Sequence, residues 1–174
     1  MNLAPDPTAF RSELAAKACD RFIERMGDHF EAEGMPRISG RLFGLMLVEV
    51  GPISFSELAE RLGVSRASIS TNSRLLERDG LIERVRHDGE RRDFFRLSDQ
   101  PFVNMIRGVA ARMRETSELV EQTCADFPDH GDGCGRIAAT RHFFTEMIST
   151  LEALAVRLAA EAPIVRASHG DVQR

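Results

Sequence analysis

The sequence predicts a mainly α-helical protein with one small β-hairpin. Over most of its 174 residues, apolar side chains recur every three or four positions, which places them on one face of a helix. The exception is 81–97, where two short runs rich in Ile, Val and Phe flank an Asp88-Gly89 pair, a hairpin-turn signal. With 43% hydrophobic and 29% charged residues, the chain can bury a core without disulfides or metal.

The first two helices are expected at 8–33 and 36–50. The first has apolar residues at intervals of four, and Gly34 and Pro36 separate the two helices. The second contains Gly40 and Gly44, four residues apart, although each glycine costs a helix about 1 kcal/mol relative to alanine. We expect them to allow close approach of another helix or to leave room for a ligand.

Two shorter helices follow, joined by a tight turn. Ser56 is expected to cap the first, which ends at Gly63, and Ser65 to cap the second, which runs over 66–79 and stops at Gly80. Apolar positions in both helices are expected to hold the pair at an angle: Leu58, Leu62, Ile69 and Leu76. Small residues at Ala59 and Gly63 are expected to let the helices cross closely.

Two strands, at 81–85 and 93–97, complete this region. Their connection, 87–91, is expected to form the tip of a hairpin. The order of short helix, turn, helix and hairpin is that of a winged helix-turn-helix.

Longer helices are expected after the hairpin, at 101–127 and 136–162, with a break rich in Gly and Asp at 128–135. The predicted organisation is an N-terminal dimerisation helix (1–35), a winged helix-turn-helix (36–99), C-terminal dimerisation helices (100–163) and a disordered tail (164–174). A single small winged helix cannot cover the apolar faces of all three long helices, which favours a homodimer over an intramolecular bundle.

The helix expected at 66–79 contains the candidate functional residues. On a helical wheel, Ile69 and Leu76 fall on one side, and short polar or cationic residues fall on the other. Short side chains allow a helix to enter the major groove of DNA, where hydroxyls and arginine reach base edges and phosphates. The residues expected to contact DNA are Ser65, Arg66, Ala67, Ser68, Ser70, Thr71, Arg74, Arg78, Arg91 and Arg92. Ser70, Thr71 and Arg74 are expected to read bases.

The distribution of charge supports a local basic surface. The chain has a net charge of −4, which argues against binding a polyanion with its whole surface. From position 61 to position 96, however, nine arginines face six acidic residues, a local balance of +3. Arg91 or Arg92, near the hairpin tip, could enter a minor groove.

The residues from Met35 to Leu97 resemble the GbsR-type branch of the MarR transcriptional regulators. The resemblance rests on "GVSRASIS-N-RLLE--GL" at 63–81 and on "GERRDFF" at 89–95. The common form has tyrosines where Phe94 and Phe95 stand here. The outer helices match only in pattern and order.

The resemblance implies a homodimer that binds double-stranded DNA at a pseudo-palindromic operator, most often as a repressor. It also implies a small-molecule effector between the dimerisation and DNA-binding parts. The second helix, at Arg41, Phe43 and Gly44, is where such an effector would bind. The alternative is that Arg37 and Arg41 pair with acidic residues or with DNA phosphate.

Other functions remain open at this point. One alternative is a winged helix that binds proteins and not DNA; another is a thiol-based redox switch through Cys19, although a buried structural cysteine is the simpler interpretation. No nucleophile–base signature, phosphate loop or zinc spacing is evident, so we expect no enzyme, cofactor or metal site. The sequence has no apolar run long enough for a membrane span and no signal peptide, which predicts a cytoplasmic protein without a membrane partner.

Overall fold

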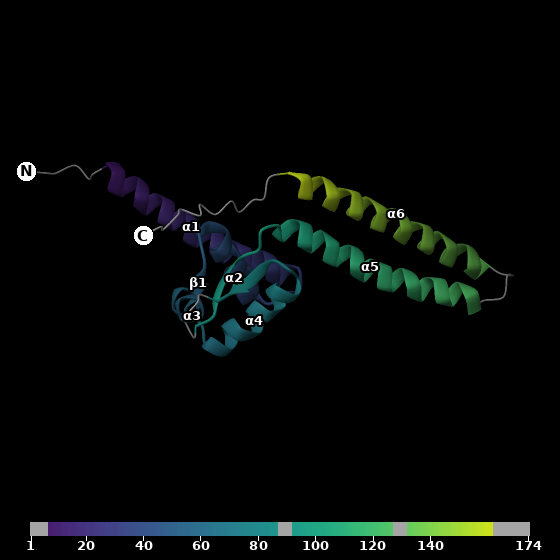
Figure 1. Cartoon of the computed structure of the whole chain (residues 1–174), viewed down its shortest axis with the longest axis horizontal. Coiled ribbons are helices and arrows are strands. Elements are labelled where there is room, and N and C mark those ends of the chain that lie inside the picture. Colours follow the sequence, from purple (N-terminus) through teal and green to yellow (C-terminus); the bar gives the residue numbers. More distant parts are fainter. Residues whose placement is uncertain (1–6, 87–91, 127–131, 162–174) are drawn as a thin grey trace, which may run out of the picture. The chain divides into compact units, whose positions relative to one another are not determined.

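The computed structural model describes residues 7–86, 92–126 and 132–161 (Figure 1). It contains two compact units, one ending at Ser98 and the other beginning at Asp99. The first contains four helices and a three-stranded sheet, and the second contains two long helices. The predicted fold class, mainly α with a small β-wing, is confirmed.

In the first unit, helix α1 (Pro7–Ala32) packs against helix α2 (Arg37–Val48) at very short range. A Cβ atom built at Gly40 would lie 2.7 Å from the Phe30 Cβ, and one at Gly44 would lie 3.1 Å from the Met26 Cβ. Close helix approach therefore explains both glycines. The Phe30 ring contacts the Phe43 ring beside them, and both side chains are buried.

Helix α3 (Phe55–Leu62) begins one residue before the serine that was predicted to cap it. The cap is Ser54, whose Oγ accepts a hydrogen bond from the Glu57 backbone N–H at 3.2 Å, so the prediction of Ser56 is wrong. Ser54 with Glu57 three residues later is a capping-box pattern, whereas Ser56 is followed three residues later by Ala59.

The turn between α3 and helix α4 (Arg66–Arg78) depends on Gly63 for a different reason from the one predicted. Gly63 has a φ of +63°, the left-handed conformation that ends α3, and a Cβ built there would meet no atom within 4 Å. The backbone conformation, and not close helix crossing, therefore requires this glycine. The predicted core residues Leu58, Leu62, Ile69 and Leu76 are all buried.

The sheet has the strand order β1-β3-β2, with both pairings antiparallel. Strand β1 (Ile53–Ser54) and strand β2 (Ile82–Val85) flank β3 (Phe94–Leu97), whose Phe95 is fully buried. Ile53 and Arg84 lie on either side of Phe95 in the register. Both predicted wing strands are present within one residue of their expected bounds; the predicted tip at 87–91 lies outside the described residues.

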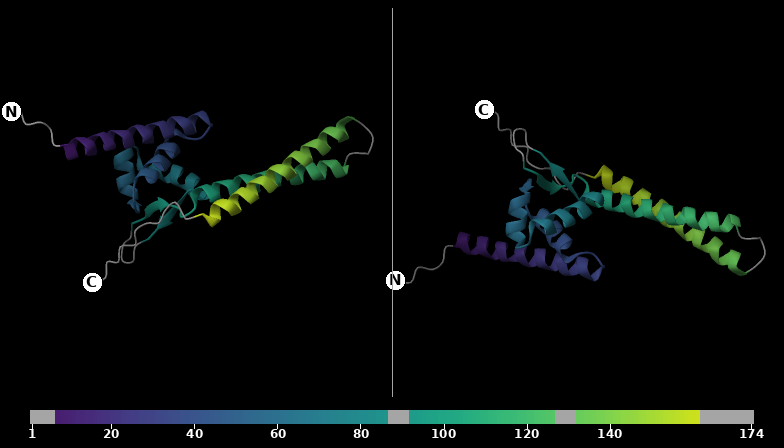
Figure 2. Two further views of the ribbon diagram at one scale, coloured as in Figure 1. Left: turned by 90° about the horizontal axis from the view of Figure 1, so that it is seen from above. Right: turned by 90° about the horizontal axis from the view of Figure 1, so that it is seen from below.

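The second unit is a helical hairpin of α5 (Pro101–Asp126) and α6 (Asp132–Ala160), which run side by side in both views of Figure 2. Val103, Ile106 and Ala155 are buried between them, with Leu151, Leu154, Leu158 and Ala159 packed around. Helix α6 begins at Asp132, so the predicted break at 128–135 is too long. Glycine is only about 1 kcal/mol less favourable than alanine in a helix, and Gly133 and Gly135 do not stop this one.

Both units leave large apolar side chains exposed. The exposed residues are Leu14 and Phe22 on α1, Val50 after α2, Met105 and Leu119 on α5, and Phe143 and Val156 on α6. Helix α1 belongs to the same compact unit as α2–α4, and its role in dimerisation stays a prediction. In the part of the chain described here, none of the helices is long and apolar enough to cross a membrane.

Candidate nucleic-acid interface

Helix α4 has one buried face and one open face. Ile69 and Leu76 are almost completely buried, while Thr71, Arg74 and Arg78 are exposed. Ala67 is also exposed, and Ser68 and Ser70 are half-buried. The helical wheel therefore divides α4 correctly, and the open face presents short side chains and arginines. That these residues contact DNA stays a prediction.

Two polar residues on the buried face of α4 find hydrogen-bond partners within the helix itself. The Asn72 Nδ2 donates to the Ser68 carbonyl at 2.8 Å, and the Ser73 Oγ donates to the Ser70 carbonyl at 3.4 Å. The Asn72 Oδ1 is buried without a hydrogen-bond partner among the described residues. Apolar periodicity alone gives no reason for these residues to be polar.

At the N-terminus of α4, the predicted cap is confirmed. The Ser65 Oγ accepts a hydrogen bond from the Ser68 backbone N–H at 3.1 Å, and the hydroxyls of Ser65 and Ser68 lie 3.0 Å apart. The positive end of a helix dipole is favourable for an anion such as a phosphate.

Arg66, the first residue of α4, is held by two residues of α3. Its Nη1 donates to the Ser56 Oγ at 3.0 Å, and its guanidinium carbon lies 5.0 Å from the centre of the Phe55 ring. Sequence reasoning missed Phe55, and it assigned Ser56 to a cap that the structure places at Ser54. Periodicity within one helix carries no signal for such a contact between two helices.

The arginines of the wing strands are mostly paired with carboxylates. Arg84 donates to both carboxylate oxygens of Glu77 at 3.2 Å and to Asp93 at 3.0 Å, and its guanidinium carbon lies 5.1 Å from the centre of the Phe95 ring. The hydrogen bond to Glu77 is the main reason why the pKa of Arg84 is raised. Arg86 also lies 3.5 Å from Asp93, and Arg96 pairs with Glu83.

Of the two arginines predicted to contact DNA from the wing, one lies in the described part of the chain. Arg92 is exposed and has no partner among the residues described. Arg91 lies outside the described residues. The basic surface at α4 and the wing is therefore smaller than the count of arginines indicates, because Arg84 and Arg96 are largely neutralised by neighbouring acids.

The residues predicted to bind an effector lie where α1 and α2 meet. Arg41, with a side chain only 18% exposed, has its Nε 2.8 Å from the Glu24 carboxylate, although this nitrogen makes no hydrogen bond. Phe43 and Gly44 are buried against α1. Effector binding there stays a prediction, and it would require the two helices to separate.

Arg37 reinforces the same helix contact. It donates to Glu24 at 2.7 Å and to Asp28 at 3.0 Å, and these two hydrogen bonds, with Glu24 first, raise its pKa.

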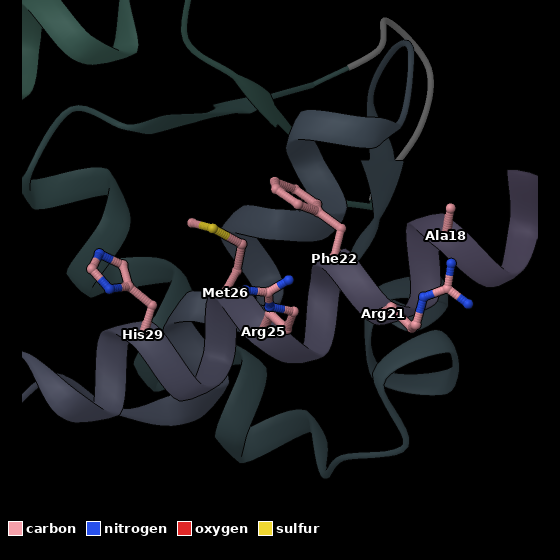
Figure 3. A pocket seen from close by; sticks show the side chains of 6 residues that line it. All are labelled: Ala18, Arg21, Phe22, Arg25, Met26 and His29. Carbon is pink, nitrogen blue, oxygen red and sulfur yellow. The ribbon is translucent and has the colours of Figure 1, made fainter.

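A hollow of about 480 Å³ lies along α1 and is lined by residues of that helix. Figure 3 shows Phe22 and Met26 projecting from the same side of the helix, with Arg21, Arg25 and His29 beside them and Ala18 at the end of the row. Neither Arg21 nor Arg25 has a partner within the described ranges. This hollow contains none of the three residues predicted to bind an effector.

Cys19 is a free thiol on α1 and is half-buried. Across the described ranges, no three His, Cys, Asp or Glu side chains gather closely enough to hold a metal ion.

Comparison with known proteins gives one family match. The model of the MarR family matches residues 33–93, from the end of α1 to the start of β3. A crystal structure described as that of a transcriptional regulator superposes with a TM-score of 0.74 at 31% identity, covering 83% of this chain and 99% of the other. Because the match covers 83% of this chain, it includes residues of both compact units.

Two bacterial relatives carry similar sequences. The chain is 41% identical over 99 residues to the HTH-type transcriptional regulator MmpR5 of Mycobacterium tuberculosis, covering 56% of this chain and 58% of that protein. It is 26% identical over 112 residues to the putative HTH-type transcriptional regulator YvaV of Bacillus subtilis, covering 63% of each. The chain thus matches less than two thirds of the length of either relative.

Proposed function

Because the chain belongs to the MarR family, we propose that it is a sequence-specific DNA-binding transcriptional regulator that acts as a repressor. The observation that carries this proposal is the open face of α4. That face combines the exposed Arg74 and Arg78 with the short side chains of Ala67, Ser70 and Thr71. Arg78 also donates to Asp79 at 3.3 Å, so Arg74 carries the less compensated charge. A helix with this surface fits a major groove, in which arginine can form two hydrogen bonds with guanine. The relatives named above are transcriptional regulators, which supports the same function.

We assign the chain to the GbsR-type branch of the family on its motifs. The support is the sequence at 63–81, which forms the turn and α4, together with "GERRDFF" at 89–95. Phe94 and Phe95 depart from the common form, and the second of them is the buried centre of the sheet. A repressor of Bacillus subtilis, OpcR, is 26% identical to the chain over 99 residues.

We further propose that the protein acts as a homodimer on a pseudo-palindromic site. The supporting observation is the set of large apolar side chains that each unit leaves in solvent, among them Phe22, Leu119 and Phe143. Removing this surface from water is worth about 25 cal/mol per Å². Two recognition helices related by a two-fold axis would read half-sites about 34–36 Å apart, one turn of DNA.

The function can be tested by selection from the source genome. Sheared genomic DNA is passed over the purified protein, and the bound fragments are sequenced and searched for a shared motif. A motif that contains a two-fold repeat supports a dimeric regulator, and its position in a promoter region supports repression. Fragments without a shared motif would contradict sequence-specific binding.

The same material separates the other two functions. A winged helix that binds only proteins would retain no duplex even at low salt, where phosphate contacts are strongest. A redox switch would require Cys19 to react with a mild pulse of peroxide, which mass spectrometry detects, and the selected duplex to dissociate as a result.

A further inference from the structure

Arg66 differs from Arg84 and Arg96 in the groups that hold its guanidinium in place. Arg84 and Arg96 are fixed by carboxylates, which neutralise their charge. Arg66 is fixed by a hydroxyl and an aromatic ring, and it has no carboxylate partner in the parts of the chain that the structure describes. Its guanidinium therefore has a defined position and keeps its full positive charge.

The ring beneath Arg66 is itself held in place. The Phe55 and Phe95 ring centres are 6.1 Å apart, and Phe95 is fully buried in the sheet. Because Phe55 rests on the core, its exposed face offers Arg66 a firm surface. A cation above an aromatic face gains about 0.5–1 kcal/mol at an exposed site, without losing its charge to an anion.

The Ser56 hydroxyl fixes the direction of the guanidinium. Arginine has five N–H donors, and the bond from Nη1 to Ser56 uses one of them. The others stay available next to the capped N-terminus of α4, where free backbone N–H groups also favour an anion.

We propose that Phe55 and Ser56 are positioning residues that hold Arg66 ready to contact a phosphate of the DNA backbone. This inference rests on the proposed DNA-binding function and extends it to two residues of α3. Holding the side chain before DNA arrives lowers the conformational entropy lost on binding, which improves affinity for specific and unrelated sequences alike.

The test compares Phe55→Leu, Ser56→Ala and Arg66→Ala with the parent protein in fluorescence-anisotropy titrations. The duplex is the best fragment from the genomic selection, and a scrambled duplex is the second probe. Arg66→Ala is expected to lower the slope of log affinity against log salt by about one, because one phosphate contact is lost. Phe55→Leu and Ser56→Ala are each expected to weaken binding to both duplexes roughly 2- to 6-fold.

The decisive variants combine these changes. In the Arg66→Ala background, Phe55→Leu and Ser56→Ala should cause no further loss of affinity, because the side chain that they position is gone. With Arg66 present, Phe55→Trp should bind as well as the parent protein, unlike Phe55→Leu, since tryptophan keeps an aromatic face for the guanidinium. Arg141→Ala removes an exposed arginine of α6 and serves as the control for charge alone.

The outcomes separate the proposal from the function on which it rests. Failure of the parent protein to bind any duplex would overturn the proposed function itself. If the parent protein binds and both α3 variants bind with the same affinity as the parent, the positioning role is overturned. It is also overturned if their losses persist without Arg66. Ser56→Ala changes only an exposed hydroxyl, so it keeps the test decisive should Phe55→Leu lower the melting temperature.

Discussion

The arginines of α2 and the arginines of α4 show how differently one residue type serves in the same compact unit. Arg37 and Arg41 on α2 lie within ion-pair distance of Glu24 on α1. Arg74 on α4 is exposed and has no partner among the described residues, and Arg66 is held by neutral groups. The two arginines of α2 hold α1 and α2 together through Glu24. The two arginines of α4 carry a positive charge that is available to an anion.

This difference shows why a count of charged residues does not by itself locate a DNA-binding surface. The balance of +3 over positions 61–96 includes Arg84 and Arg96, whose partners are on the same surface. Arg78 on the open face of α4 also has a carboxylate neighbour, since its Nε lies 3.3 Å from Asp79. Arginines such as Arg74 that have no such neighbour among the described residues offer the most uncompensated charge, and a sequence does not state which carboxylates are neighbours. The contrast between α2 and α4 can be tested by substitution in each helix.

The largest effect is expected from Gly40→Ala, which forces α1 away from α2. Alanine normally stabilises a helix relative to glycine, but here its Cβ would overlap the Phe30 side chain and the Met26 backbone carbonyl. We expect a loss of about 3 kcal/mol in the free energy of unfolding, measured by urea denaturation. Gly108→Ala on α5 is the matched control, because its Cβ would meet only the flexible end of Arg112 at 3.6 Å; it should be neutral or stabilising. An equally mild result at Gly40 would contradict the close packing.

Arg74→Ala should act on DNA binding and leave folding unchanged. If Arg74 reads a base, its loss should cost about 1–3 kcal/mol on the selected duplex and relax the sequence preference. Anisotropy titrations on selected and scrambled duplexes measure both effects. Equal losses on the two duplexes would show that Arg74 contacts only phosphate.

Arg41→Ala should give the opposite pattern. The side chain is mostly buried beside Glu24, so we expect a loss of about 1 kcal/mol in unfolding free energy, with Arg37 still pairing with the same carboxylate. The affinity for the selected duplex should stay the same. Weaker DNA binding at unchanged stability would place Arg41 among the DNA-contacting residues and remove the contrast between the helices.

Arg92→Ala is expected to cause a smaller change, confined to electrostatics. Arg92 is exposed near the wing tip, and one lost phosphate or minor-groove contact should lower the salt slope by about one. Affinity measured at several salt concentrations checks this. An unchanged slope would place Arg92 away from the DNA.

The smallest effect is expected from pH on the paired arginines. Hydrogen bonding to Glu77 raises the pKa of Arg84 in the folded state, so its contribution is complete below the unfolded-state pKa and is lost only in strongly alkaline solution. The difference in unfolding free energy between Arg84→Ala and the parent should therefore be equal at pH 7 and pH 9. A difference that shrinks as pH rises would contradict this assignment.

Much of the fold could be predicted because it follows from local patterns. Apolar spacing identified Ile69 and Leu76 as the core face of α4, and the Asp88-Gly89 pair separated the two wing strands. The start of α3 was missed, even though Ser54 and Glu57 carry a capping pattern, because Ser56 offered a second plausible cap.

The remaining features of the candidate site depend on contacts between elements. The Phe55 ring meets Arg66 only because α3 and α4 cross, and Glu77 meets Arg84 only because the wing folds back onto the end of α4. The apolar periodicity of a single helix predicts neither of these contacts. The open face of α4 could be predicted, whereas the groups that position or neutralise its neighbouring arginines required the tertiary structure.

The most direct test of the account is the affinity of the purified protein for the selected duplex relative to its scrambled form, measured by anisotropy at physiological salt. A sequence-specific regulator should prefer the selected duplex by roughly 10³-fold or more. Arg74→Ala should reduce this preference, and Arg41→Ala should leave it intact. A ratio near one for the parent protein would contradict the claim that the open face of α4 reads a DNA sequence.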